Sequence, residues 1–248
     1  MNYVDYLTPV GKRVHGEYLQ LNNLIESHIQ KTSKSLDIHW KNVDGLIAIN
    51  GTKIKTAVLD CKLGIIGVPQ TPLHLLKKSL CNYPVLSYRQ LKLVNSYLKI
   101  FEYRPFVYGG MGFAPLKASN KRNKSWICTT NIESVAEMNQ PNTMEITFEQ
   151  CSHPIQVQVS DYFLKERKRE VSQVQRFHDA FHAQYEVAST DQFQNTYSQF
   201  KYGTFPEDPM HFEFFVLKET IRRTLEMLEY EYTDKMLVEM AKKQMEYC

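Results

Sequence analysis

The stretch Gly45-Leu-Ile-Ala-Ile-Asn-Gly-Thr-Lys-Ile-Lys-Thr-Ala-Val-Leu59 carries the strongest short-range signal for the fold of this chain. Two runs rich in aliphatic and β-branched residues flank the dipeptide Asn50-Gly51. Asn-Gly tolerates the positive φ angles of a type I′ turn, and such a pair between apolar runs is typical of a β-hairpin. We therefore predict a hairpin over residues 45–59, at the start of a β-rich centre.

The segments on either side of this hairpin read as helices. Apolar side chains recur every three or four residues between Gly16 and Gln30, which predicts a helix over that range. Beyond the hairpin, Thr71 suits a helix N-cap and Pro72 the first helical position. This second helix is expected to end before Asn82.

Further along the chain, short apolar and aromatic runs punctuated by Gly and Pro predict strands, and longer amphipathic runs after Asp161 predict helices. The fold class is therefore α+β: a β-rich central region of hairpins, an N-terminal helix and a helical C-terminal third. Three parts follow, namely residues 1–44, 45–160 and 161–248. The predicted strands cover residues 97–103, 106–108, 112–114, 125–129, 143–148 and 155–159, and the predicted C-terminal helices cover 162–185, 206–228 and 234–245.

The composition narrows the class of protein. No apolar run approaches the roughly 20 residues that span a bilayer, and the N-terminus lacks the apolar region of a signal peptide. The five cysteines are an odd number, are widely scattered and form no CxxC motif. This pattern is typical of reduced thiols, so we expect a cytoplasmic protein without disulfides, zinc ribbon or other cofactor.

Charge is distributed very unevenly along the chain. The overall net charge is only +3, yet residues 61–132 hold eleven Lys and Arg residues and a single acid, Glu102. The next 28 residues, 133–160, hold four acids and no Lys or Arg. A segment so basic and so poor in acids favours binding of a polyanion, although a solvated face neutralised by the C-terminal part is the alternative.

Within this basic segment, the run from Lys117 to Trp126 is the sharpest candidate for contact. Its cations alternate with Ser and Asn side chains that can hydrogen-bond to phosphates, and a loop of this composition can enter a minor groove. Outside the loop, arginines and lysines near aromatic residues are further candidates, although such residues are also common at sheet edges. The predicted contact residues are Lys77, Lys78, Tyr88, Arg89, Lys92, Arg104, Lys117, Ser119, Asn120, Lys121, Arg122, Asn123, Lys124 and Asn131.

Two other constellations offer alternatives. His178, Asp179 and His182 place two histidines four residues apart on a predicted helix, as metal ligands of a hydrolase or nuclease would require. However, Asp stands where the HExxH motif has its general base, and no third ligand is marked. The aromatic residues between Tyr97 and Tyr108 could stack on single-stranded bases, but such residues more often form the buried face of a sheet. We therefore expect a binding protein and not an enzyme, with a basic module for protein or RNA as a further alternative.

Four stretches, taken in order along the chain, together form a recognisable pattern: Pro72–Cys81, Phe113–Ser119 with Ser125–Ile132, Thr143–Phe148 with Ile155–Val159 and Tyr162–Phe163, and Phe205–Asp208 leading into Phe214–Arg223. In these stretches the chain resembles the competence transcription factor (ComK) family of low-GC Gram-positive bacteria. The departures from the family pattern are Cys128-Thr-Thr-Asn131 in place of a histidine-rich stretch, an inserted stretch over residues 184–201 and a C-terminal extension of about 25 residues.

The resemblance implies a transcriptional activator of competence (DNA-uptake) genes that binds paired A·T-rich boxes of double-stranded promoter DNA, largely through the minor groove. It further implies a homo-oligomer, dimer or tetramer, in which residues 45–160 bind DNA and residues 161–248 serve oligomerisation or activation, with RNA polymerase as a further partner. The alternative for the C-terminal region is a helical cap on the core. Tyr202–Pro206 is a faint counterpart of the segment that a Clp-protease adaptor binds in the family.

Overall fold

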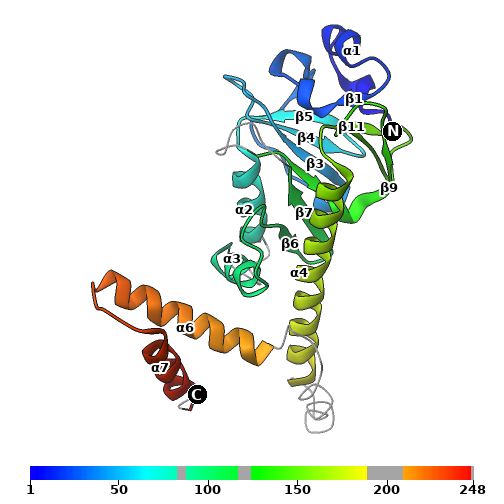
Figure 1. The fold of residues 1–248 in the computed structure, drawn as a ribbon. Coiled ribbons are helices and arrows are strands. Elements are labelled where there is room, and N and C mark those ends of the chain that lie inside the picture. The colour runs from blue at the N-terminus through cyan, green and yellow to red at the C-terminus, as the bar shows by residue number, and fades with distance from the viewer. Residues whose placement is uncertain (83–87, 117–123, 189–208, 247–248) are drawn as a thin grey trace. The chain divides into compact units, whose positions relative to one another are not determined.

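The computed structural model describes residues 1–82, 88–116, 124–188 and 209–246 (Figure 1). Contacts divide the chain into two compact units, Met1–Leu91 with Ile100–Gln175, and Lys92–Lys99 with Arg176–Cys248. The predicted residues 1–44 and most of 45–160 thus belong to one unit. The division falls within two helices, α3 (Tyr88–Tyr97) and α4 (Asp161–Ala188), so that each of them contributes to both units.

The first unit contains two mixed β-sheets, which confirms the α+β class. The larger sheet has the strand order β2-β5-β4-β3-β8-β7-β6 and the smaller one β1-β11-β10-β9. The strands of the larger sheet are β2 (Lys31–Thr32), β3 (Val43–Ala48), β4 (Thr56–Asp60), β5 (Gly64–Val68), β6 (Phe106–Tyr108), β7 (Met111–Pro115) and β8 (Trp126–Cys128); those of the smaller sheet are β1 (Leu19–Gln20), β9 (Ile132–Glu137), β10 (Met144–Phe148) and β11 (Ile155–Val157).

The predicted hairpin over residues 45–59 is confirmed by the antiparallel pair β3 and β4. Every residue of β4 is buried, as expected for a strand in the middle of a sheet. The turn differs from the prediction, because neither Asn50 nor Gly51 has a positive φ angle. The loop is longer than two residues and is held by the Glu26 carboxylate, which accepts hydrogen bonds from the backbone N–H groups of Thr52 (2.7 Å) and Lys53 (3.2 Å).

Helix α2 (Pro72–Asn82) covers one face of the larger sheet and confirms the second predicted helix. Thr71 caps it as expected, its hydroxyl accepting the N–H of His74 at 3.4 Å. Leu75, Leu76 and Leu80 pack into the same buried cluster as the sheet residues. The basic residues at positions 77 and 78 are consequently left on the exposed side of the helix.

Helix α4 lies against the first unit through its N-terminal half. A Cβ atom added at Gly112 of β7 would come within 2.2 Å of Val171 of α4, so this glycine permits a close helix–strand approach. Thr129 and Thr130, in a short 3-10 turn (Thr129–Asn131), bind the carbonyl and the N–H of Gly112 through their hydroxyls. Helix α4, with its bounds Asp161–Ala188, confirms the helix predicted over residues 162–185.

The helix predicted over residues 16–30 is wrong. Helix α1 (Pro9–His15) precedes this range and ends at Gly16, which has a φ of 66° that a helix cannot continue. Of the apolar residues that follow, Leu19 is buried in strand β1 and Leu21 in the 3-10 turn Leu21–Asn23. Leu24 and Ile29 are buried directly after the 3-10 turns Leu21–Asn23 and Glu26–His28, whereas Ile25 is exposed. Leu19 is placed by the parallel pairing of β1 with β11, and Ile29 by a bridge to Leu7, so the spacing of the apolar residues does not reflect a helical face.

The strand predicted over residues 97–103 is also wrong, while the other predicted strands are confirmed with small shifts of their ends. Tyr97 is the last residue of α3, and the residues after it form a turn in which Lys99 and Tyr103 have positive φ angles. Four strands were not predicted: β1, β2, β5 and β9. The longest of them, β9, forms an outer strand of the smaller sheet beside β10.

The second unit contains the two remaining predicted helices, α6 (Pro209–Met227) and α7 (Asp234–Glu246). Phe212 of α6 contacts Phe177 and Tyr97, with ring centroids 4.9 and 5.4 Å apart, and this aromatic cluster is the core of the unit. Leu237 and Ala241 of α7 are fully buried. In the ranges that the structure describes, no helix combines the length and the apolar character needed to cross a membrane.

Candidate functional site

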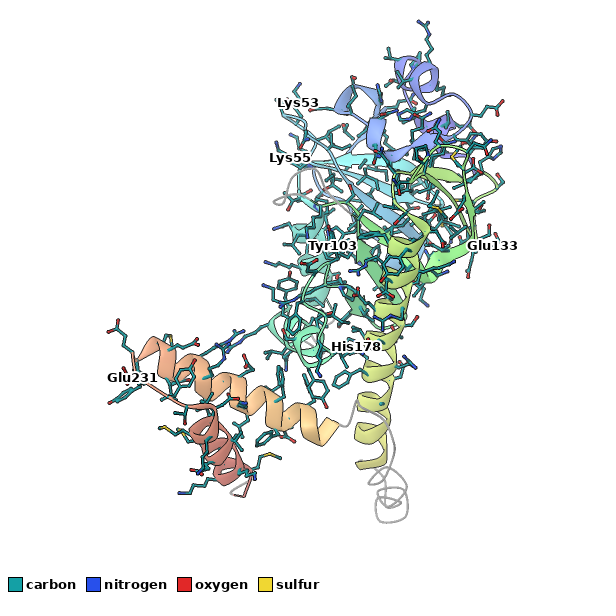
Figure 2. The ribbon with its side chains drawn as sticks, in the orientation of Figure 1. Lys53, Lys55, Tyr103, Glu133, His178 and Glu231 are labelled. Carbon is teal, nitrogen blue, oxygen red and sulfur yellow. The ribbon has the colours of Figure 1, made fainter. Side chains whose placement is uncertain are left out.

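Tyr103 is the best-defined feature of the basic segment in the folded chain (Figure 2). Its backbone is left-handed, with φ of 47°, a conformation rare for a large side chain. Arg167 of α4 holds this turn by donating to the carbonyl oxygens of Glu102 (3.3 Å) and Tyr103 (3.4 Å). The ring of Phe163 meets the Tyr103 ring edge to face, at 5.1 Å.

The arginine that supports Tyr103 is itself fixed. Its guanidinium makes two contacts with the Glu170 carboxylate, at 2.7 and 3.1 Å, and both side chains are buried. Burial raises the pKa of Glu170 above its ordinary value, and the charge of Arg167 opposes that rise. The pair thus anchors the turn to α4, and the Tyr103 ring is oriented before any ligand arrives.

Two predicted contact residues meet at this ring or beside it. The ammonium group of Lys124 lies 4.8 Å from the centroid of the Tyr103 ring, in a cation–π contact. Arg104 follows Tyr103 directly in the sequence, and its positive charge acts on the phenol of Tyr88. Burial is the larger influence on Tyr88 and raises its pKa, whereas Arg104 lowers it.

A second lysine–tyrosine pair completes the arrangement. Lys77 of α2 lies 4.6 Å from the centroid of the Tyr88 ring at the start of α3. The two pairs, Lys77 with Tyr88 and Lys124 with Tyr103, lie in the first unit, as does Arg104, which is adjacent to Tyr103 in the sequence and acts through its charge on Tyr88. We call these five residues (Lys77, Tyr88, Tyr103, Arg104 and Lys124) the cation–tyrosine array.

The side chains of the cation–tyrosine array have the chemistry of an anion-binding surface. A tyrosine ring positions a nearby cation without cancelling its charge, in contrast to a carboxylate. Lys and Arg positioned in this way are donors for phosphate oxygens, and a half-buried tyrosine ring offers an edge or a face to a sugar or a base. These properties are those of a surface for phosphate-containing polymers.

Other predicted contact residues lie elsewhere or lie outside the described residues. Lys78 lines a cavity of about 320 Å³ together with Asp37 and Trp40. Arg89 is exposed at the start of α3, and Lys92 belongs to the second unit. The positions that lie outside the described residues are Lys117, Ser119, Asn120, Lys121, Arg122 and Asn123.

Asn131 has a different environment from the rest of the predicted set. Its amide donates to a carboxylate oxygen of buried Asp44 at 3.0 Å. Asp44 also accepts from the hydroxyl of Tyr3 (2.7 Å) and the thiol of Cys151 (3.4 Å), and its burial raises its own pKa. Burial is also the main reason why the pKa of Cys151 rises to about 12. These side chains form a polar network inside the first unit, and Asn131 is part of it.

Two residues of the alternative metal site, His178 and Asp179, differ in exposure. His178 is buried, with 4% of its surface exposed, whereas Asp179 next to it is exposed. The side chain of His182 lies outside the described residues. Among the side chains that the structure describes, no group of three or more His, Cys, Asp or Glu residues is placed to hold a metal ion.

The aromatic residues considered as a stacking platform do not share one surface. Phe106 and Tyr108 are buried in β6, and Tyr97 belongs to the aromatic cluster of the second unit. Phe101, 66% exposed, and the half-buried Tyr103 are the accessible ones. Arg167, which orients Tyr103, carried no signal in the sequence, because it lies 64 positions further along the chain in an ordinary amphipathic helix.

Comparison of the chain with family models, with curated proteins and with solved structures finds no match.

Proposed function

We propose that this protein is a DNA-binding transcriptional regulator and that the cation–tyrosine array is part of its DNA-contact surface. The observations that carry the proposal are the cation–π contacts of Lys77 with Tyr88 and of Lys124 with Tyr103, with Arg104 adjacent to Tyr103 in the chain. These cations come from three separate parts of the acid-poor segment 61–132.

The charge composition of the segment 61–132 favours a phosphate polymer over a protein partner. Protein-binding surfaces that rely on charge commonly interleave acids and bases, whereas here the only acid among 72 residues is Glu102. Neutralising phosphates with Lys and Arg releases counterions, and this is the dominant electrostatic contribution to DNA binding. Tyrosine hydroxyls and arginine guanidinium groups add hydrogen bonds to the backbone or to base edges.

The finer assignment rests on the resemblance to competence transcription factors. On that basis the targets are A·T-rich promoter boxes of DNA-uptake genes, read largely in the minor groove, where a narrow groove enhances the negative potential that attracts arginine. An activator of this kind acts in the cytoplasm with RNA polymerase, and a Clp-protease adaptor would control its amount.

The test measures binding to an A·T-rich and a G·C-rich duplex by fluorescence anisotropy at several salt concentrations. The variant K77Q/R104Q/K124Q should lose roughly a hundredfold in affinity near physiological salt, and the slope of log K against log salt should fall by about 2 to 3. The matched control K12Q/R13Q/K34Q removes three exposed cations outside the array and should change both quantities far less.

Each result separates the proposed function from its alternatives. Preference for the A·T-rich duplex, competed by a minor-groove dye, supports a sequence-selective regulator. Equal affinity for heparin and for every DNA sequence would instead indicate a general basic module. If the array variant binds as tightly as the control variant, the contact surface lies elsewhere and the proposal is wrong.

A further inference from the structure

The hairpin of helices α6 and α7 exposes an unusual amount of apolar surface. In the described ranges eleven large hydrophobic side chains are exposed, and five of them fall between residues 227 and 240. Single exposed apolar residues are ordinary, but a local concentration of them marks an interaction site. The five are Met227 (80% exposed), Leu228 (60%), Tyr230 (65%), Met236 (46%) and Met240 (41%).

Helix α6 adds to this surface, because it does not bury a full apolar stripe. Phe212 near its start is buried, with 7% exposed, but the apolar residues that follow remain partly exposed. An amphipathic helix normally buries its apolar stripe against another element. The partly exposed residues are Phe214, Phe215, Val216, Leu217, Ile221 and Leu225.

Helix α7 has two neighbouring stripes of apolar side chains, one buried and one exposed. Leu237 and Ala241, four residues apart, are fully buried. Met236 and Met240 have the same spacing and are displaced by about 100° around the helix, the angle between successive residues, so they flank the buried stripe. Methionine side chains are flexible and pack against varied surfaces, which suits an interface that forms between molecules.

The charges around this apolar surface are complementary to each other. Glu229 and Glu231 are exposed at the turn between α6 and α7, where Figure 2 shows Glu231. Lys242 and Lys243 are exposed near the other end of α7. If two such hairpins pack antiparallel about a two-fold axis, the acidic turn of each copy meets the basic end of the other, and both contacts are favourable.

We propose that α6 and α7 form a self-association surface, on which a second copy of this chain docks through the same hairpin. The product is a two-fold bundle of four helices, an arrangement in which helical hairpins bury their apolar faces. The dimer buries Met227, Leu228, Met236 and Met240 and pairs Glu229 and Glu231 with Lys242 and Lys243 of the second copy. This inference does not depend on the proposed DNA binding.

The experiment is analytical ultracentrifugation of the full chain without DNA, over a range of protein concentrations. The wild-type chain should be a dimer that dissociates on dilution. The variant M236E/M240E should raise the dimer dissociation constant about a hundredfold or more, because each copy would bury two carboxylates. The control V10E/V14E changes an exposed apolar pair of the same spacing on α1, 56% and 47% exposed, and should leave the dimer intact.

Charge reversal tests the geometry without altering the apolar residues. E229K/E231K and K242E/K243E should each weaken the dimer, and the four changes combined in one chain should restore it. A wild-type chain that stays monomeric at its highest soluble concentration overturns the proposal. So does a dimer that survives M236E/M240E, or one that the combined charge reversal fails to restore. Because no DNA is present, none of these results bears on the proposed DNA binding.

Discussion

The left-handed backbone of Tyr103 lowers the stability of the folded chain locally, and contacts with other residues must offset this loss. A residue with a Cβ atom in this conformation is less stable than in the usual regions by about 1–2 kcal/mol. Two hydrogen bonds from Arg167 and an edge-to-face contact with Phe163 hold it in place. The ring is therefore positioned without a ligand, which reduces the ordering that binding would otherwise require.

The contribution of the Tyr103 ring can be measured with two substitutions. Tyr103→Phe keeps the ring face near Lys124 and should leave DNA affinity within about threefold of the wild type, losing at most one neutral hydrogen bond. Tyr103→Ala removes the ring and the orientation of Lys124 and should cost about tenfold, as stacking and cation–π contacts of this size do. Equal affinities for both variants would show that the ring takes no part in binding.

A pair of buried histidines joins the N-terminal elements. Nδ1 of His15 accepts the backbone N–H of Gln20 at 3.2 Å, so the proton of the neutral ring is on Nε2. This Nε2–H faces Nδ1 of His28 at 3.1 Å. Burial, with a smaller contribution from His28, lowers the pKa of His15 from 6.5 to about 4, and burial also lowers the pKa of His28.

The pair predicts a loss of stability in mild acid. Above pH 6.5 His15 is neutral in the folded and the unfolded chain, and the stability is complete. As the pH falls from about 6.5 to about 4, the unfolded chain takes up a proton that the folded chain excludes, and His15 alone should cost up to about 3 kcal/mol.

Urea unfolding at pH 7 and pH 4.5 measures this effect. The variant His15→Gln should show a smaller difference between the two pH values than the wild type, whereas His39→Gln, which changes an exposed histidine, should not. Identical pH dependence in the wild type and in His15→Gln would contradict the assignment.

At the scale of elements, the sequence predicted what local chemistry determines. The Thr71-Pro72 start places α2 correctly, and alternating apolar residues place the hairpin of β10 and β11. By contrast, β9 has the sequence Ile-Glu-Ser-Val-Ala-Glu, with little apolar periodicity, and is a strand because it pairs with β10. Strand β1 likewise depends on pairing with β11, far away in the chain.

For the candidate site, the sequence predicts individual residues but not their arrangement. The basic segment and the residues Lys77, Tyr88, Arg104 and Lys124 are visible as composition. Their grouping around two rings is not, because it depends on how α2, the turn at Tyr103 and α4 pack together. The hydrogen bond from half-buried Asn131 to buried Asp44 is equally a result of tertiary packing.

The contact between α4 and β7 gives a prediction at this scale. Gly112→Ala places a methyl group about 2.2 Å from Val171 and should lower the free energy of unfolding by about 1–3 kcal/mol, measured by urea denaturation. The control Gly110→Ala adds the same methyl group where nothing lies within 4 Å and should have little effect. Equal stability of both variants would mean that α4 does not approach β7 this closely.

At the scale of the whole molecule, charge is separated within the first unit. The segment 61–132 supplies the cation–tyrosine array. The acids of 133–160 lie on strands β9 and β10 of the smaller sheet or, for Glu149, directly after β10, and Glu133 is apart from Tyr103 in Figure 2. Such a separation orients a protein as it approaches DNA, with the basic surface leading and the acidic sheet repelled. The small net charge of +3 conceals this arrangement.

The outer strands of the two sheets have a consequence for how copies of this protein can meet. Among the described strands, three of the four outer ones, β1, β2 and β6, have two or three residues, and only β9 is longer, with six. An outer strand of that length can template pairing with another molecule and lead to fibre-like aggregates, but β9 carries Glu133 and Glu137, and two copies side by side would bring like charges together. Growth through the sheets is thereby discouraged, and helical surfaces are left as the places where two copies of the chain can meet.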